Sequence, residues 1–142
     1  MLDKPFNPPP TFLPSADDLS AMWEGVPILK RTIDLYKLYY GFAELFPKKD
    51  KYTIGATCER YIIEILEILL QAGYLPKEAK LPLIKTASNK FDALKIFIRL
   101  LRELNIIDQK KYLALHTIIQ EIGRMFGGWM KSLNGPTQKL SL

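Results

Sequence analysis

Few residues in this chain belong to the types that usually perform catalysis or bind metals. The sequence holds one histidine, His116, and one cysteine, Cys58. A zinc site needs about four Cys, His or carboxylate ligands. A di-iron bundle needs Glu-x-x-His pairs, whereas Leu113 stands three residues before His116. Glu64 and Glu67 share a helix face but are expected to be solvated. We therefore predict a non-enzymatic protein without metal, cofactor or small-molecule substrate.

Basic residues are the more informative candidates. Residues 77–102 carry seven Lys or Arg against two acidic residues, a net +5 that equals the charge of the whole chain. Lys95, Arg99 and Arg102 fall within one narrow helical sector, which we expect to lie opposite the apolar face. Such a row matches successive phosphates or a carboxylate-bearing partner. Without interleaved aromatic residues, nucleic-acid binding would be electrostatic and sequence-tolerant. The alternative is a solvated helix face.

Lys90 differs from this row. Helical geometry puts it on the apolar side, between Ala87 and Leu94, where a lysine is rarely fully buried unless paired. It either extends to the end of the bundle or lines a channel between subunits. The full set of candidate binding residues is Lys85, Lys90, Lys95, Arg99, Arg102 and Arg124. The next basic cluster to consider is Lys48, Lys49 and Lys51.

The composition is typical of a soluble chain with a single folded domain. Of its 142 residues, 48% are hydrophobic and 25% are charged. No apolar run approaches the roughly 18 residues of a membrane span, and the N-terminus has no secretion-signal pattern. A single cysteine fits a reducing compartment, so we expect a cytoplasmic protein without membrane contact. We divide it into a proline-rich acidic arm (1–25), a bundle (26–134) and a tail (135–142).

Apolar residues recur at helical spacing in four segments, and no segment alternates usefully with period two. Pro27 suits a first helical position, and Pro47 is expected to end the first helix after Phe46. Asp50 is expected to cap the second helix and Gly73 to stop it.

The third helix is expected to follow a connector and to begin just before Pro82, with Asn105 at its end. Asp108 caps the fourth helix, which runs to about Leu133. Short connections predict an all-α, up-down-up-down four-helix bundle. The inward stripe predicted for the third helix is Leu83, Ala87, Leu94, Phe97, Leu101 and Leu104.

The second helix is apolar nearly all round. A stripe of little more than 100° suffices for a helix in a monomeric bundle, and surplus apolar surface usually marks an interface. We therefore predict a homo-oligomer. The residues that extend the apolar arc are Tyr61, Ile63, Ile68 and Leu70.

Two glycines in the fourth helix also indicate a close contact between helices. Gly123 and Gly127 are four residues apart, so they share one flank and let a neighbouring backbone approach. The alternative is that they make room for Trp129 and Tyr112 within one chain. They do not form a phosphate loop, because such a loop follows a strand.

The runs "LFPKKDKYTIGATCERYIIEILEILLQAGY" and "IIQEIGRMFGGWMKSL", with the basic third helix between them, resemble the Avd family of four-helix bundles. Avd is the accessory variability determinant of diversity-generating retroelements. A more distant resemblance is to the ribosomal RNA intervening-sequence proteins. The similarity covers residues 26–133. It implies a homopentameric barrel with a basic surface, associated with the reverse transcriptase and with the RNA or DNA of the retroelement.

Two functions follow as hypotheses. The first is an oligomeric, nucleic-acid-binding accessory protein of a retroelement, which acts with its reverse transcriptase and template RNA. The second is an oligomeric helical scaffold whose basic face binds an acidic protein partner without nucleic acid. Salt-dependent binding to RNA or DNA distinguishes them.

Overall fold

The computed structural model describes residue 15 and residues 26–134. The predicted arm at 1–25, apart from Ser15, and the predicted tail at 135–142 lie outside the described residues. No strand occurs in the described ranges, and no helix there is long and apolar enough to cross a membrane. The elements are α2 (Pro27–Ala43), α3 (Lys48–Lys51), α4 (Ile54–Ala72), α5 (Lys77–Glu103) and α6 (Gln109–Asn134).

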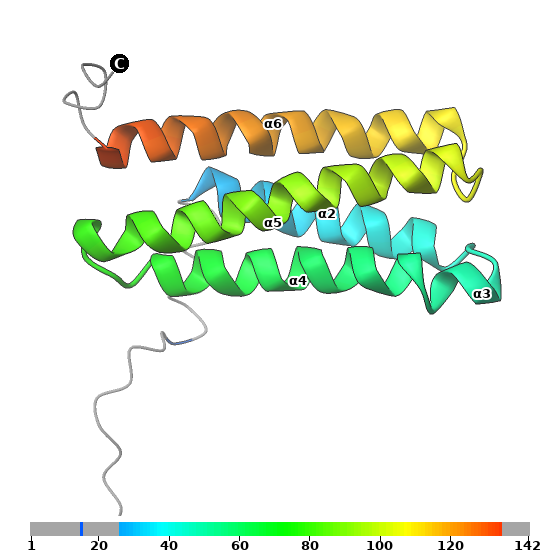
Figure 1. Ribbon diagram of the computed structural model, residues 1–142, viewed down its shortest axis with the longest axis horizontal. Helices are drawn as coiled ribbons and strands as arrows, with labels where there is room; N and C mark the ends of the chain where they lie inside the picture. The colour runs from blue at the N-terminus through cyan, green and yellow to red at the C-terminus, as the bar shows by residue number, and fades with distance from the viewer. Residues whose placement is uncertain (1–14, 16–25, 135–142) are drawn as a thin grey trace, which may run out of the picture.

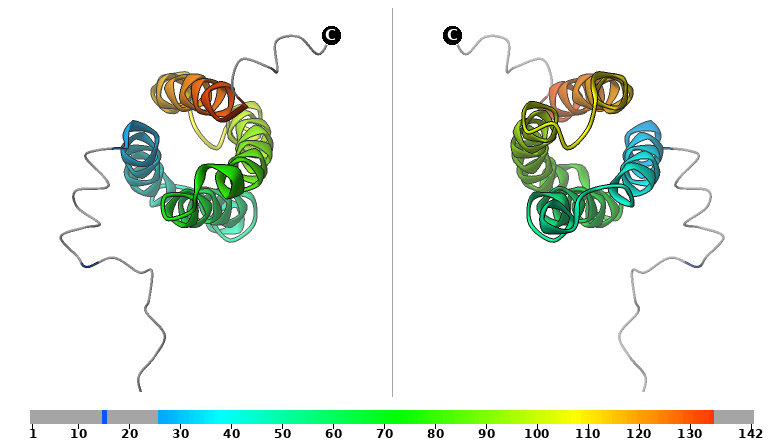
Figure 2. Two further views of the ribbon diagram at one scale, coloured as in Figure 1. Left: turned by 90° about the vertical axis from the view of Figure 1, so that its left-hand side faces the viewer. Right: turned by 90° about the vertical axis from the view of Figure 1, so that its right-hand side faces the viewer.

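The four long helices form a ring in which each packs against its neighbours in sequence. The pairs in contact are α2 with α4, α4 with α5, and α5 with α6, and α2 meets α6 to close the ring. Successive helices run in opposite directions (Figure 1), and the end-on views show the four helices around a common centre (Figure 2). The predicted up-down-up-down four-helix bundle is therefore confirmed.

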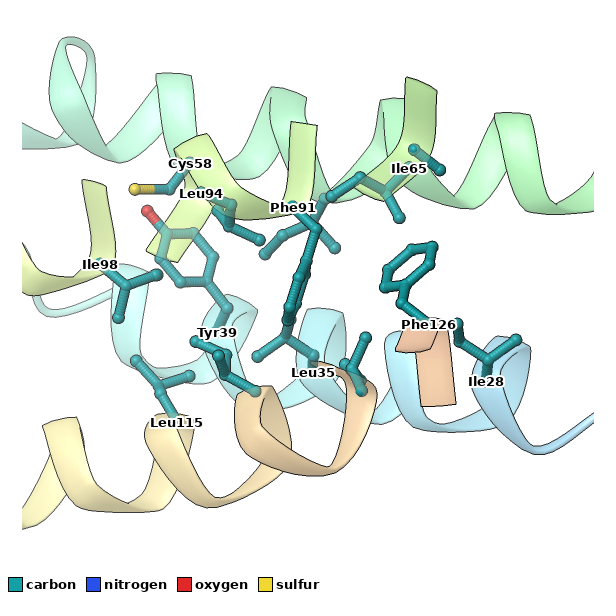
Figure 3. Close-up of a cluster of buried hydrophobic side chains, with 14 of the residues drawn as sticks. Ile28, Leu35, Tyr39, Cys58, Ile65, Phe91, Leu94, Ile98, Leu115 and Phe126 are labelled. Atoms are coloured by element: carbon teal, nitrogen blue, oxygen red, sulfur yellow. The ribbon is translucent and has the colours of Figure 1, made fainter. Parts of the chain in front are cut away.

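The core consists of one apolar stripe from each long helix. Leu35, Ile65, Phe91 and Phe126 come from the four different helices, and all four are buried (Figure 3). The Phe91 and Phe126 rings lie 5.4 Å apart, within the range of favourable aromatic pairs. Burying one such side chain stabilises the fold by about 1.5–3 kcal/mol, so these stripes determine how each helix is rotated.

The predicted stripe of α5 was rotated from the true one. Leu104 is 60% exposed and Phe97 only half-buried, so both are wrong as core residues. Leu83 and Phe97 each precede another apolar residue, and neighbouring residues lie about 100° apart around a helix. Packing buries these following residues, Ile84 and Ile98, while Ala87, Leu94 and Leu101 belong to both stripes. The buried residues of α5 are Ile84, Ala87, Phe91, Leu94, Ile98 and Leu101.

The turn between α5 and α6 follows the prediction. Asn105 adopts a left-handed conformation with φ of 60°. The amide of Ile106 donates to the Leu101 carbonyl at 2.8 Å, and the amide of Asn105 donates to the Arg102 carbonyl at 3.1 Å, which is the Schellman pattern. Asp108 then accepts a hydrogen bond from the Lys111 amide at 2.8 Å, which confirms it as the N-cap of α6.

The first helix ends earlier than predicted, at Ala43 rather than at Phe46. Turn hydrogen bonds replace the helical pattern there, since the Phe46 amide donates to the Ala43 carbonyl at 3.1 Å. The chain thereby folds Phe46 back into the core, where its ring meets Tyr39 edge-on at 5.9 Å.

Asp50 does not cap the second helix, contrary to the prediction. Its amide donates to the Pro47 carbonyl at 3.0 Å, so Asp50 already lies inside the short helix α3. The residue at the N-cap of α4 is Thr53.

The predicted connector before the third helix is also partly helical. Gly73 caps the end of α4 as predicted, but α5 begins at Lys77 and not just before Pro82. Pro82 lies in the second turn of α5. It has no backbone N–H, so it cannot donate a hydrogen bond to the Glu78 carbonyl. The first turn is nevertheless fixed, because the Lys80 amide donates to the Pro76 carbonyl at 3.1 Å.

Gly55 is the glycine that the fold requires. The Tyr39 hydroxyl donates to the Gly55 carbonyl at 2.6 Å, which holds α2 against the start of α4. A Cβ atom on Gly55 would lie 2.9 Å from the Asp50 carbonyl oxygen and 3.0 Å from the buried ring of Phe46. Only a residue without a side chain fits this corner.

We expect Gly55→Ala to lower the free energy of unfolding by about 1–3 kcal/mol, because the added methyl group overpacks the corner. Gly41→Ala is the matched control, since nothing lies within 4 Å of a Cβ atom at that exposed position of α2. It should stabilise the protein by about 0.5–1 kcal/mol. Urea unfolding measures both, and a stabilising Gly55→Ala would contradict the packing described here.

Candidate nucleic-acid interface

The predicted basic row lies on the flank of α5 that faces α6, not opposite the apolar face as expected. Lys95 and Arg99 border a depression of about 170 Å³ that α6 completes with Tyr112 and His116. Arg99 also borders a shallower depression of about 420 Å³, together with Arg102 and Tyr112. The structure thus brings the three cations together, along about 10 Å of helix, beside the α5–α6 groove.

Each of the three cations has a polar neighbour. Lys95 Nζ lies 3.1 Å from Asp92, and Arg99 Nε lies 2.9 Å from Glu103. These pairs join exposed residues of one helix and contribute little to stability, so a phosphate can replace the carboxylate. Arg102 Nε donates to the Gln109 amide oxygen at 2.8 Å, and no carboxylate pairs with Arg102 in the described part of the chain.

Lys90 belongs to the seam between α4 and α5 and not to this row. Its Nζ lies 3.1 Å from Glu64 and 5.3 Å from the centre of the Tyr61 ring. The Glu64 side chain remains 36% exposed, as a solvated residue would, but its ion pair with Lys90 was not predicted. Lys85, in the N-terminal half of α5, is exposed.

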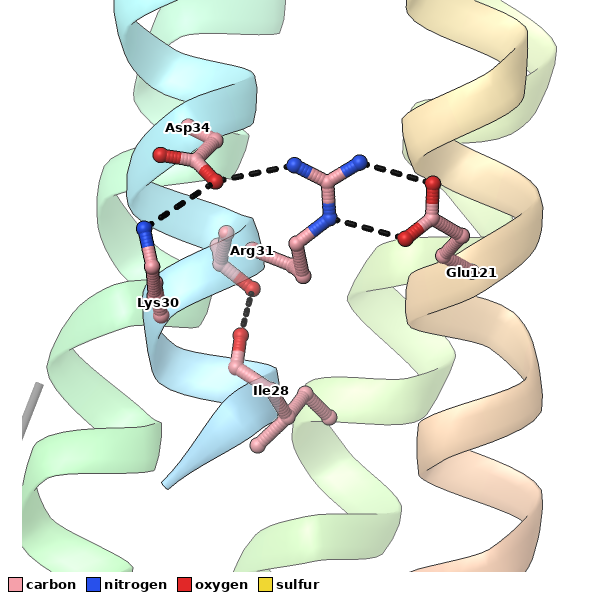
Figure 4. A network of polar contacts seen from close by, with 6 residues as sticks. Ile28, Lys30, Arg31, Asp34 and Glu121 are labelled. Carbon is pink, nitrogen blue, oxygen red and sulfur yellow. Dashed lines mark hydrogen bonds and ion pairs between the residues drawn. The ribbon is translucent and has the colours of Figure 1, made fainter. Parts of the chain in front are cut away.

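An ion-pair network joins the first and last helices of the ring. Arg31 of α2 donates two hydrogen bonds to Glu121 of α6, from Nε at 2.9 Å and from Nη2 at 2.7 Å, and a third to Asp34 at 2.8 Å (Figure 4). Bidentate arginine–carboxylate pairs are among the stronger polar contacts. The hydrogen bonds from Arg31 lower the pKa of the Glu121 carboxyl, and those to Glu121 and Asp34 raise the pKa of Arg31.

This network leaves α6 without an unpaired carboxylate. Glu121 is the one acidic residue between 109 and 134, and Arg31 neutralises it. Arg124, the candidate on this helix, is exposed. α6 carries four Lys or Arg against one acid, a net of +3, and α5 carries seven against three, a net of +4. α4 carries one against three, a net of −2. α2 carries three against one, a net of +2, so α4 is the one long helix with a net negative charge, and α5 and α6 are the most basic pair.

Neither residue with catalytic chemistry is placed to use it. His116 is half-buried and stacks on Tyr112, with ring centroids 5.5 Å apart. Burial raises the pKa of the Cys58 thiol to about 12, so the thiol stays protonated at neutral pH. Across residue 15 and residues 26–134, no three His, Cys, Asp or Glu residues come together as a metal site.

The residues assigned to subunit contacts are less exposed than predicted. Tyr61 is half-buried and packs edge-on against Phe97 at 5.1 Å, so its ring is used within the chain. Ile68 and Leu70 are half-buried as well, whereas Ile63 is 37% exposed. The α4–α5 contact therefore accounts for part of the surplus apolar surface that the sequence suggested.

The glycines of α6 have no close neighbour within the chain. A Cβ atom on Gly123 would meet Phe91 at 3.6 Å, an ordinary contact, and one on Gly127 would meet nothing within 4 Å. The alternative that they make room for Trp129 and Tyr112 is therefore wrong. Among the described residues, nothing requires glycine at these two positions.

Two features escaped the sequence analysis. Arg31 and Glu121 are 90 residues apart, and no spacing rule connects them. The other is the exposure of Tyr40 and Tyr52 beside the α3 lysines, since periodicity does not show which tyrosines stay outside. The Arg31–Asp34 pair, by contrast, follows from its i, i+3 spacing.

These observations define an all-helical, four-helix-bundle protein whose positive charge is highest on α5 and α6. The sequence profile described as bAvd-like matches residues 26–133, which cover almost the entire bundle. The chain therefore belongs to the bAvd-like family, and the resemblance to Avd proteins is confirmed. No curated protein matches the sequence.

We expect Glu121→Gln to lower the free energy of unfolding at neutral pH and to make it less dependent on pH in the acidic range. The folded-state pKa of Glu121 lies below the ordinary glutamate value of about 4.3. Its stabilisation is therefore complete above that value and is lost as the pH falls through the folded-state pKa.

Unfolding experiments between neutral and acidic pH measure this effect. Glu67→Gln is the control, because Glu67 is an exposed carboxylate on α4 without an ion pair among the described residues. If Glu121→Gln and Glu67→Gln gave the same pH dependence, the Arg31 contact would not be what stabilises Glu121.

Proposed function

We propose that this chain is a non-enzymatic accessory protein of a diversity-generating retroelement, which binds nucleic acid through its α5–α6 side and associates with the reverse transcriptase and its template RNA. Membership of the bAvd-like family supports the retroelement role. The uneven charge of the bundle supports the nucleic-acid role. The proposal places the protein in the cytoplasm, together with the retroelement RNA.

The observation that carries the nucleic-acid role is the position of Lys95, Arg99 and Arg102 beside the α5–α6 groove. The two carboxylates near them are exposed and exchangeable, and Arg124 adds charge on α6. Counterion release makes such contacts favourable for any sequence. Three phosphate contacts give a salt slope of about −2.7 on duplex DNA, which is modest for a single chain.

Assembly would turn these weak contacts into useful affinity. In an oligomer, the second contact with the same nucleic acid becomes intramolecular, and avidity can exceed the single-site affinity by a factor of about 10²–10⁴. We propose a homo-oligomer, a pentamer by family resemblance, in which Ile63 and the flank of α6 with Gly123 and Gly127 contribute to the contact. Ile63 is exposed, and both glycines would accept a close neighbour.

The second candidate, a scaffold for an acidic protein, has one specific observation in its favour. Ile96 is 58% exposed and lines the same depression as Lys95 and Arg99. An exposed isoleucine beside arginine suits a protein interface better than a phosphate.

We expect Lys95→Gln/Arg99→Gln/Arg102→Gln to lower the affinity for duplex DNA or structured RNA at least tenfold, and to reduce the salt slope by about 2.7. Fluorescence anisotropy over a salt series measures both. The control Lys30→Gln/Lys37→Gln/Arg60→Gln removes the same charge from exposed positions of α2 and α4.

Equal losses in the two triple variants would mean that net charge alone drives binding, and no loss in either would exclude the α5–α6 side. An acidic peptide that binds the parent while nucleic acid does not would favour the scaffold function.

We expect Gly127→Ala to weaken assembly while it stabilises the isolated chain. Alanine improves the helix by roughly 0.5–1 kcal/mol where it meets no neighbour, but the methyl group would separate two closely packed subunits. Sedimentation at several concentrations measures assembly, and unfolding at the lowest concentration measures the chain. Gly41→Ala should stabilise without altering assembly. Unchanged assembly of Gly127→Ala would remove Gly127 from the proposed contact.

A further inference from the structure

Three large apolar side chains are exposed at the end of the bundle where α2 leads into α4. Tyr40 is 54% exposed, Leu45 is 71% exposed and Tyr52 is 70% exposed. They lie on the last turn of α2, just after it, and just after α3, at one end of the molecule (Figure 1). We call this surface the α3 corner. It consists of Tyr40, Leu45, Lys48, Lys49, Lys51 and Tyr52.

The lysines of the α3 corner hold unpaired charge. Lys48, Lys49 and Lys51 are all exposed, and none forms an ion pair within residues 26–134. The four residues of α3 carry a net +2, because Asp50 is their one acid. In this they differ from Lys95 and Arg99, which already contact carboxylates. The corner therefore attracts a polyanion without first breaking an ion pair.

Tyr40 of the corner packs beside a second tyrosine on α2. Tyr40 lies 6.1 Å from the Tyr36 ring, and the Tyr36 hydroxyl donates to Glu59 at 2.9 Å. A depression of about 260 Å³ is lined by Tyr40 and Lys51 and also by the carboxylates Glu44 and Glu59. One ring, one ammonium group and two carboxylates thus line the hollow, whereas Tyr52, Lys48 and Lys49 lie outside it. Phosphates would therefore contact the lysines at its rim. Positioned rings lose little conformational freedom when a ligand stacks on them.

We propose that the α3 corner is a second nucleic-acid site, specific for single strands, in which bases stack on Tyr40 and Tyr52 and phosphates contact the three lysines. This inference rests on the proposed nucleic-acid function and adds a preference that the α5–α6 side does not give. Bases inside a duplex are already stacked, whereas those of a single strand have free faces for aromatic side chains. The single-stranded template and its new copy are the chemical class that such a site fits.

Binding of a labelled single strand and a labelled duplex, each of about 20 nucleotides, tests the proposal. In Tyr40→Ala/Tyr52→Ala, the single-strand affinity should fall about 10- to 100-fold, because each base–aromatic contact is lost, while duplex affinity stays unchanged. Tyr40→Phe/Tyr52→Phe keeps the rings and should bind like the parent. Lys48→Gln/Lys49→Gln/Lys51→Gln should reduce the single-strand salt slope by about 2. All five substituted side chains are exposed, so circular dichroism should not change.

The outcomes separate the two sites. If the alanine variant bound single strands as well as the parent, the α3 corner would be excluded, and the α5–α6 proposal would stand. The parent protein could instead bind single strands but not duplex, and this binding could be lost only in the α3 corner variants. That result would support the α3 corner and exclude the α5–α6 side as a binding site. A polyglutamate peptide that binds the parent, needs both tyrosines and leaves single strands unbound would overturn the inference in favour of a protein-docking surface.

Discussion

The ring of four helices depends on the contact between its first and last members, and Arg31 with Glu121 is the polar centre of that contact. Three hydrogen bonds from one guanidinium hold Glu121 and Asp34 at once. The same contact pairs the single carboxylate of α6 with Arg31. The remaining charged residues of that helix are all basic. The ion pair thus joins α2 to α6 beside the apolar core and leaves α6 without an unpaired carboxylate.

The glycines in the two segments that resemble the Avd family are explained differently. The Phe-Pro…Tyr-Thr-x-Gly segment is explained within one chain, because Gly55 must sit beneath Phe46 and accept the Tyr39 hydrogen bond. The Gly-x-x-x-Gly-Gly-Trp segment is not, because Gly127 faces open space. A helix tolerates glycines at a cost of about 1 kcal/mol each, so their presence on an open flank is consistent with close approach by another subunit.

The sequence was sufficient to predict the helices, because apolar spacing and local capping are encoded within a few residues. Asn105 and Asp108 stood where the α5–α6 turn needs them. The rotation of α5 was not predictable, since Phe97 and Ile98 are both apolar and only packing decides which one is buried. The basic row could be predicted from its spacing. Its position beside α6, and the capture of Lys90 by Glu64, depend on contacts between helices that no local pattern contains.

We propose that the α5–α6 side, and not α4, contacts nucleic acid. Ultraviolet crosslinking of the assembled protein to template RNA, followed by mass spectrometry of the peptides, tests this most directly. We expect crosslinks on peptides that contain Lys95, Arg99 or Arg124, and none on the outward residues of α4, where carboxylates repel phosphate. Crosslinks concentrated on α4 around Arg60 and Ile63 would contradict it.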